Sequence, residues 1–99
     1  MMEENNSTIK EVIASLKFNA EGLIPAIAQQ HDTGEVLMMA WMNKESIEAS
    51  FVEDRVVYWS RSRQALWRKG ETSGQTQHLK EIRWDCDGDT LLLQVEQEG

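Results

Sequence analysis

The apolar residues of this chain fall in short runs broken by turn-forming residues, and this feature limits the fold most. The runs lie at about 26–30, 35–42, 56–60 and 91–95. Segments of this length that are bounded by turn-forming residues are typical of strands, and the run 56–60 is also rich in β-branched and aromatic residues. Each is far shorter than the roughly 20 apolar residues that span a bilayer. The pattern therefore predicts a sheet, and no membrane insertion.

Two segments carry helix signals instead. Thr8 and Glu11 fit a capping box at the start of a predicted amphipathic helix over about 8–17. Asn43 is a good N-cap for a second, shorter helix that we expect to end near Asp54. The sequence thus predicts one helix before the first strand and another between the second and third.

The strand runs suggest an antiparallel order. Turn residues 31–34 join the first two runs into a predicted hairpin with a largely buried second strand. Residues 61–76 show no clean periodicity and are interpreted as one long ordered loop. In the last third, Ile82, Trp84 and Cys86 alternate with polar residues before the chain returns at 91–95. We predict an α+β fold with a mainly antiparallel sheet and two flanking helices.

Composition narrows the functional classes. The 99 residues form one expected domain, 1–99, with 17 acidic and 10 basic residues and a net charge of -7. Such a charge repels nucleic acid and anionic membranes, so neither is an expected partner. The single cysteine excludes an internal disulfide and favours a reducing compartment, and the acidic N-terminus is unlike a secretory signal. We expect a cytoplasmic protein.

The segment Asp85-Cys86-Asp87-Gly88-Asp89 is the strongest candidate site. On an extended backbone its three carboxylates, at Asp85, Asp87 and Asp89, would converge on one face and suit a hard cation such as Mg²⁺. The same alternation would point the Cys86 sulfur to the opposite face, where a thiolate prefers Zn²⁺. The segment predicts ligands for two different metals.

Two other interpretations of this segment stay open. It can be a solvated acidic turn, with Cys86 filling the core. It can also belong to a small acidic Ca²⁺- or Mg²⁺-binding module, because Asp85, Asp87, Asp89 and Glu96 occupy positions 1, 3, 5 and 12 of the EF-hand pattern. Thr90 stands where that pattern needs glycine, and three residues after Glu96 are too few for its exiting helix.

A second constellation is basic. It holds five of the ten basic residues, namely Arg55, Arg61, Arg63, Arg68 and Lys69. Arginine forks, hydroxyl groups and glycine-rich backbone are the components of a phosphate-binding loop. A solvated basic strand face is the alternative, and a phosphate-binding protein without catalysis is a third functional hypothesis. His31 and His78 are expected to be ordinary surface or hydrogen-bonded histidines.

Three motifs in order resemble the phosphoribosyl-AMP cyclohydrolases of histidine biosynthesis. They are Tyr58-Trp59-Ser60-Arg61-Ser62-Arg63, then Leu66-Trp67-Arg68-Lys69-Gly70-Glu71-Thr72-Ser73-Gly74, then the aspartate segment 85–89. The likeness covers about Gly22 to Gly99. It implies a hydrolase that opens the purine ring of phosphoribosyl-AMP between N1 and C6, with zinc lowering the pKa of the attacking water.

The resemblance also implies site residues and partners. Asp85, Asp87 and Asp89 match magnesium ligands, and Cys86 matches a zinc ligand shared with the partner subunit of an obligate homodimer. The small phosphorylated nucleotide substrate would contact Arg61, Ser62, Arg63, Trp67, Lys69, Gly70, Glu71, Thr72, Ser73 and Gly74. Trp84 and the strand 91–95 are expected at the dimer interface.

One departure from the family concerns zinc. Family members continue past the position of Gly99 into a Cys-His-Thr-Gly stretch and a further Ser-Cys-Phe, which hold two more zinc cysteines and a histidine. We therefore expect the domain to be C-terminally incomplete here, with the general base beyond Gly99. A catalytic zinc normally has three protein ligands. This chain alone is expected to bind zinc poorly and turn over little substrate.

Overall fold

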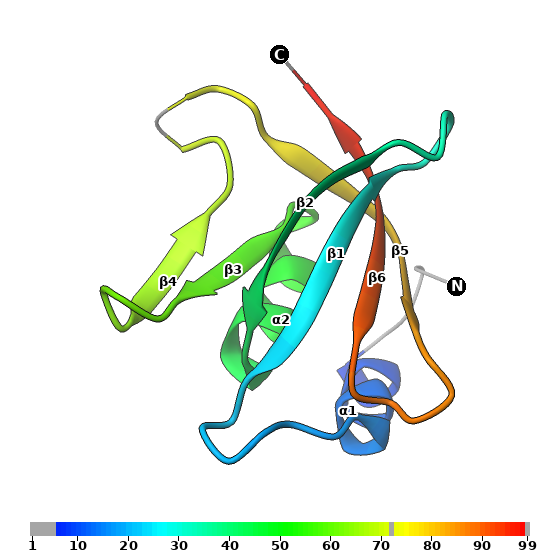
Figure 1. Ribbon diagram of the computed structural model, residues 1–99, viewed down its shortest axis with the longest axis vertical. Coiled ribbons are helices and arrows are strands. Elements are labelled where there is room, and N and C mark those ends of the chain that lie inside the picture. Colours follow the sequence, from blue (N-terminus) through cyan, green and yellow to red (C-terminus); the bar gives the residue numbers. More distant parts are fainter. Residues whose placement is uncertain (1–5, 72, 99) are drawn as a thin grey trace.

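A computed structural model describes residues 6–71 and 73–98 of the chain, which form an α+β fold (Figure 1). The predicted fold class is confirmed. None of the helices in these ranges is long and apolar enough to cross a membrane. The elements in chain order are α1 (Asn6–Ser15), β1 (Ile24–Gln30), β2 (Val36–Met42), α2 (Lys44–Glu53), β3 (Val57–Ser60), β4 (Ala65–Arg68), β5 (Gln77–Trp84) and β6 (Leu91–Gln97).

The strands form one six-stranded sheet with the order β4-β3-β2-β1-β6-β5. Every neighbouring pair is antiparallel except β1 and β6, which run parallel. The sheet curls strongly, because the Val56 N–H donates to the Gln77 carbonyl at 2.8 Å and Arg55 pairs with His78. These contacts join the β3 side to the start of β5, so the two ends of the sheet approach one another in a half-barrel.

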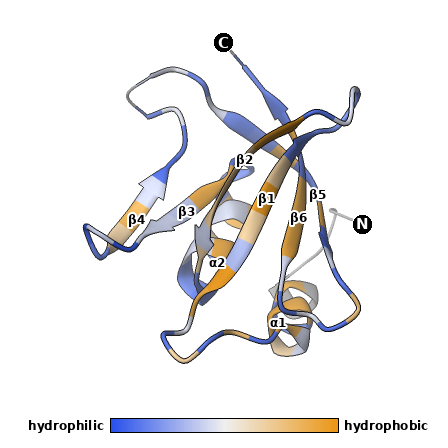
Figure 2. Cartoon of the chain, in the orientation of Figure 1, coloured by the Kyte–Doolittle hydropathy of each residue, from blue (hydrophilic) through white to orange (hydrophobic). Residues whose placement is uncertain are grey.

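The core lies on the inner face of this curved sheet. On β1, the side chains of Ile24, Ala26 and Ala28 are fully buried, as period-two alternation requires. The matching positions on β6 are buried in the same way, and both helices pack against this face. Figure 2 shows hydrophobic residues along β1, β2 and β6, and mostly hydrophilic connections between strands. Burial of the apolar face is the main favourable term for this fold.

The prediction for the first hairpin was wrong in one respect. β1 is the more buried strand, whereas β2 is partly exposed, with Val36 64% and Met39 55% exposed. The physical reason is position in the sheet. β1 lies between β2 and β6 and carries small inner-face residues beneath the helices, while the outer face of β2 has no covering layer within the described residues.

One further difference concerns the bounds of the first helix. The first helix begins at Asn6 and ends at Ser15, so the pair Thr8 and Glu11 does not mark its start. The second helix follows the prediction, because the Asn43 side chain accepts from the Ser46 N–H at 2.8 Å in a capping box.

The long loop predicted over 61–76 was wrong, since β4 lies within it. Basic residues flank this four-residue strand on both sides, so its apolar alternation is too short to stand out in the sequence. Pairing with β3 makes it a strand, through a register that runs from Val57 opposite Arg68 to Ser60 opposite Ala65. Gln64 takes a left-handed conformation, with φ 53°, in the tight turn between the two strands.

Candidate metal centre and adjacent cavity

The aspartate segment forms a tight turn between β5 and β6. The Gly88 N–H donates to the Asp85 carbonyl at 3.0 Å, and the Asp89 N–H donates to the Asp85 carboxylate at 3.0 Å. Gly88 adopts φ +73°, and a Cβ there would lie 3.0 Å from the Ser15 carbonyl oxygen. Helix α1 and the turn therefore touch so closely that glycine is required at this position.

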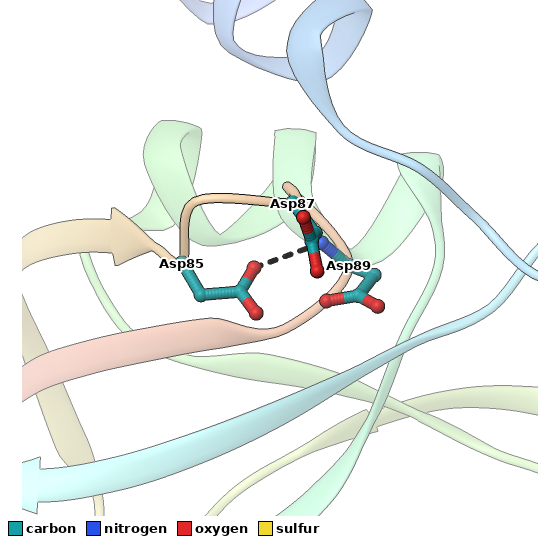
Figure 3. Close-up of side chains that lie close together, drawn as sticks. All are labelled: Asp85, Asp87 and Asp89. Atoms are coloured by element: carbon teal, nitrogen blue, oxygen red, sulfur yellow. Dashed lines mark hydrogen bonds between the residues drawn. The ribbon is translucent and has the colours of Figure 1, made fainter.

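Three carboxylates project side by side from this turn (Figure 3). One ligand oxygen from each of Asp85, Asp87 and Asp89 lies within 4.8 Å of the other two, and all three residues are exposed. A hydrogen bond with the Asp85 carboxyl, and the negative charges of Asp85 and Asp87, raise the pKa of Asp89. Desolvation raises the pKa of Asp85, but hydrogen bonds from Asp89 and from nearby backbone N–H groups outweigh this effect, so the pKa of Asp85 is lowered. This cluster of repelling oxygens fits the donor set of a hard divalent cation.

The structure corrects the predicted geometry of the segment. Residues 85–90 are not an extended strand, and the carboxylates meet because the chain folds back around Asp85. The expected placement of Cys86 on the opposite face of an extended strand is also wrong, because Cys86 is an exposed residue of the same turn. Its sulfur lies 3.9 Å from the Asp87 carboxylate, so thiol and carboxylates share one exposed turn. The alternative in which Cys86 fills the core is excluded.

The EF-hand alternative does not agree with the fold. Its position-12 ligand would be Glu96, but Glu96 lies in β6, paired opposite His78 of β5. Its carboxylate is 3.7 Å from both Lys80 Nζ and His31 Nε2. An EF-hand loop needs this residue at the start of a helix that closes around the ion. His31 and His78 are surface residues paired with glutamates, as predicted.

The predicted basic loop is divided by β4 into two separate parts. Arg61, Ser62 and Arg63 lie in the β3–β4 turn, while Lys69 and Gly70 follow the far end of β4. A strand of four residues separates these ends by about 10 Å. In Figure 1 the turn and the loop lie at opposite ends of this hairpin. Residues 61–74 are therefore not one continuous loop, and their contacts with phosphate stay a prediction.

Two of the five basic side chains serve the fold. Arg68 forms a bidentate pair with Glu53, with its Nη2 and Nε at 2.6 Å and 2.9 Å from the carboxylate oxygens. This hydrogen-bonded pairing lowers the pKa of Glu53. Arg55 donates to the Lys69 carbonyl at 3.0 Å. Both side chains thus contact groups of the protein itself.

The loop after β4 is held by its own backbone. Gly70 has φ +88°, and a Cβ there would lie 2.4 Å from the Thr76 nitrogen. The Gly74 N–H already donates to the Gly70 carbonyl at 2.8 Å. Glu71 and Ser73 belong to the same loop, and the predicted contact at Thr72 lies outside the described residues. Trp67 is half-buried against Tyr58, with ring centroids 5.4 Å apart.

Sequence reasoning missed a cavity of about 1000 Å³ at the other end of the hairpin. It opens between the α1–β1 connection, the start of α2 and the β3–β4 turn. No motif marked the first two of these segments. Residues on its wall include Phe18, Leu23, Lys44, Trp59, Arg61 and Ser62.

The described residues fit zinc only in part. Cys86 offers one accessible thiolate, and neither described histidine lies in the aspartate turn. Three protein ligands are the norm for catalytic zinc. Within the described ranges, the three-carboxylate cluster is the one group of metal-ligating side chains close enough to hold an ion.

The fold and the turn define an α+β protein with a cluster of three carboxylates beside a curved sheet. The sequence model for phosphoribosyl-AMP cyclohydrolase matches residues 38–99. Curated phosphoribosyl-AMP cyclohydrolases are 68% identical over 93 residues in Rhodospirillum centenum and 68% over 88 residues in Paramagnetospirillum magneticum. These alignments cover 94% and 89% of this chain, and 70% and 67% of the relatives. The Rhodospirillum rubrum relative is 58% identical over 97% of this chain and 69% of its own length.

The chain belongs to the phosphoribosyl-AMP cyclohydrolase family. Its members are hydrolases of histidine biosynthesis that open the purine ring of phosphoribosyl-AMP. The resemblance inferred from three motifs is confirmed, and with it the assignment of the chain as an enzyme of this class.

Proposed function

We propose that the aspartate turn is the metal centre around which this chain performs the family's ring-opening hydrolysis. The observation that carries the proposal is the approach of three carboxylates within 4.8 Å, next to the exposed thiol of Cys86. Hard and soft ligands side by side in one turn are an unusual combination for a merely structural turn. They match the two kinds of metal expected for this chemistry.

Magnesium is the cation proposed for Asp85, Asp87 and Asp89. Oxygen-only ligands and full exposure suit an ion that keeps several of its waters. The Asp89 N–H, bonded to the Asp85 carboxylate at 3.0 Å, orients that ligand before any ion arrives. The residues of the turn thus hold and aim the carboxylates.

Zinc is proposed to bind through Cys86 together with ligands that residues 1–99 do not contain. When bound, it would supply activation of the water that attacks the purine ring. A thiol on an exposed turn is accessible to ligands from a second subunit or from further sequence. We assign no other step to the metal, because one thiolate alone does not make its site.

The proposed partner is a second copy of this chain. The outer face of the sheet supports this, since Ile27 stands opposite Met39 on β2 and Leu92 on β6, forming an apolar row across three strands. The buried neighbours on β1 place Ile27 on the outer side. The interface expected at 91–95 is reduced to Leu92, because Leu91, Leu93 and Val95 fill the chain's own core. A nucleotide substrate is the other proposed partner, and neither nucleic acid nor a membrane is.

We further propose that the protein works in the cytoplasm. Its only cysteine is a free, exposed thiol, and such a thiol persists in a reducing compartment.

The test is turnover of phosphoribosyl-AMP, followed by loss of the purine ring, with Mg²⁺ and Zn²⁺ supplied. A protein carrying this sequence together with the C-terminal continuation of its relatives should consume the substrate. Cys86→Ser should abolish zinc-dependent turnover while thermal unfolding stays unchanged, because the side chain is exposed. Full activity of Cys86→Ser, or no turnover by the unaltered protein with both metals, contradicts the proposal.

A further inference from the structure

Two cationic residues, Lys44 and Arg61, line the cavity at the β3–β4 turn. Lys44 Nζ stands 5.9 Å from the centroid of the Phe18 ring, and the Arg61 guanidinium stands 4.7 Å from that of Trp41. Over residues 6–71 and 73–98, neither cation forms an ion pair with a carboxylate. Contacts with aromatic rings hold a cation in place without neutralising it, so both charges remain available to an anion.

The cavity has the size and lining of a ligand site. Its volume of about 1000 Å³ reaches the upper end of the range of small-molecule pockets. Trp59 and Phe18 supply aromatic walls, and Ser62 lines the cavity together with Arg61. Arginine, lysine and hydroxyl donors around one space are the group that recognises a phosphate monoester.

Two carboxylates, Glu21 and Glu45, also line the cavity. They make a bare inorganic anion a poor occupant. Carboxylates accept hydrogen bonds from sugar hydroxyls, so a phosphate attached to ribose matches the mixed charge better.

The cavity is physically connected to the metal centre. The Lys17 N–H donates to the Gly88 carbonyl at 2.7 Å, and the next residue, Phe18, forms part of the cavity wall. The α1–β1 connection thus touches the aspartate turn with one residue and the cavity with the next.

We propose that this cavity binds a ribose-phosphate end of the substrate, with Lys44 as a phosphate-binding residue beside Arg61 and Ser62. The inference rests on the proposed function for the identity of the ligand. It assigns a role to the start of α2 that the sequence motifs did not indicate. The inference also distinguishes the role of Lys44 from that of Lys69, because Lys69 lies at the far end of the β3–β4 hairpin.

The experiment is an NMR titration of the chelator-treated protein with AMP and, in parallel, with adenosine. AMP should shift the amide signals of Lys44, Arg61 and Ser62, and it should bind more tightly than adenosine. Lys44→Gln should weaken AMP binding by roughly tenfold and leave adenosine binding unchanged. Lys44→Arg should restore most of the affinity. Lys80→Gln, which removes an exposed lysine paired with Glu96, is the matched control and should change neither.

Unchanged AMP affinity in Lys44→Gln, or AMP shifts confined to 69–74, overturns the inference. Because the titration contains no catalytic metal, its result is independent of turnover. An inactive protein that still binds AMP through Lys44 contradicts the proposed hydrolysis and leaves the subsite in place. An active protein whose AMP affinity does not depend on Lys44 contradicts the subsite and leaves the proposed hydrolysis in place.

Discussion

The aspartate turn and the basic segment 55–74 look alike in sequence, since each concentrates one sign of charge, but they fold in opposite ways. The turn gathers its carboxylates within 4.8 Å. The basic segment spreads its side chains over both ends of a hairpin, and Glu53 neutralises Arg68 on the way. Charges spaced over five residues can meet in a single turn, whereas a strand between them keeps them apart.

The largest expected effect concerns the backbone that fixes the basic segment. Gly70 and Gly74 share a positive φ, but only at Gly70 would a Cβ collide with backbone, 2.4 Å from the Thr76 nitrogen. Gly70→Ala should lower the free energy of unfolding by about 3 kcal/mol. Gly74→Ala, strained only in φ, should cost about 1 kcal/mol. Urea unfolding of both variants measures this, and equal losses would show that the loop after β4 is not sterically fixed.

The second prediction tests whether the turn is a metal site. Asp85→Asn removes one ligand charge and weakens the acceptor of the Asp89 N–H. Mg²⁺ affinity, measured by calorimetric titration, should fall about thirtyfold, or about 2 kcal/mol. Asp32→Asn alters another exposed turn aspartate, outside the cluster, and should leave Mg²⁺ affinity as it was. Similar losses of Mg²⁺ affinity in both variants would show that the ion is attracted by a diffuse acidic surface and not bound at the turn.

The third prediction concerns the contact between β3 and β5, which helps to fix the basic segment relative to the strand that leads into the aspartate turn. The buried Tyr58 hydroxyl donates to Gln77 Oε1 at 2.8 Å, which ties β3 to β5. Tyr58→Phe leaves that acceptor buried without its donor and should cost about 1–2 kcal/mol in urea unfolding. Thr33→Ala removes an exposed hydroxyl that accepts from Glu35 at 3.2 Å and should cost much less. Equal costs would mean that the sheet edges are joined elsewhere.

The smallest effect is expected at the exposed pair of Glu53 and Arg68. The hydrogen bond from Arg68 holds the pKa of Glu53 below its ordinary value of 4.5. The pair therefore stabilises the fold above that ordinary value, and its contribution disappears as the pH falls through the lower, folded-state pKa. Thermal unfolding should separate wild type from Glu53→Gln slightly at pH 7, and no longer at strongly acidic pH.

The same pair sharpens the comparison between the regions. If Arg68 serves only the fold, Arg68→Gln should leave AMP affinity unchanged, whereas Arg61→Gln should weaken it. A loss of AMP affinity in Arg68→Gln would show that the Arg68 side chain contributes to phosphate binding.

Much of the local structure could be predicted from sequence. Asn43 caps α2 as expected, the alternation around Ile82 marks β5, and the spacing of the three aspartates indicated that their carboxylates converge. These features depend on interactions within a few residues, which is the range that spacing and propensity describe. β4 was missed because a four-residue strand exists only through its pairing with β3.

The sequence by itself determined the family and the fold class, and it indicated the candidate metal-ligating side chains, because these follow from residue type and order. Only the tertiary structure decided where they lie. It exposes Cys86, divides the basic segment between two ends of a hairpin, and brings Lys44 and Phe18 to the cavity beside Arg61. The reason is that such contacts join residues far apart in the chain. The curvature of the sheet and the packing of helices against it bring them together, and no local pattern records either.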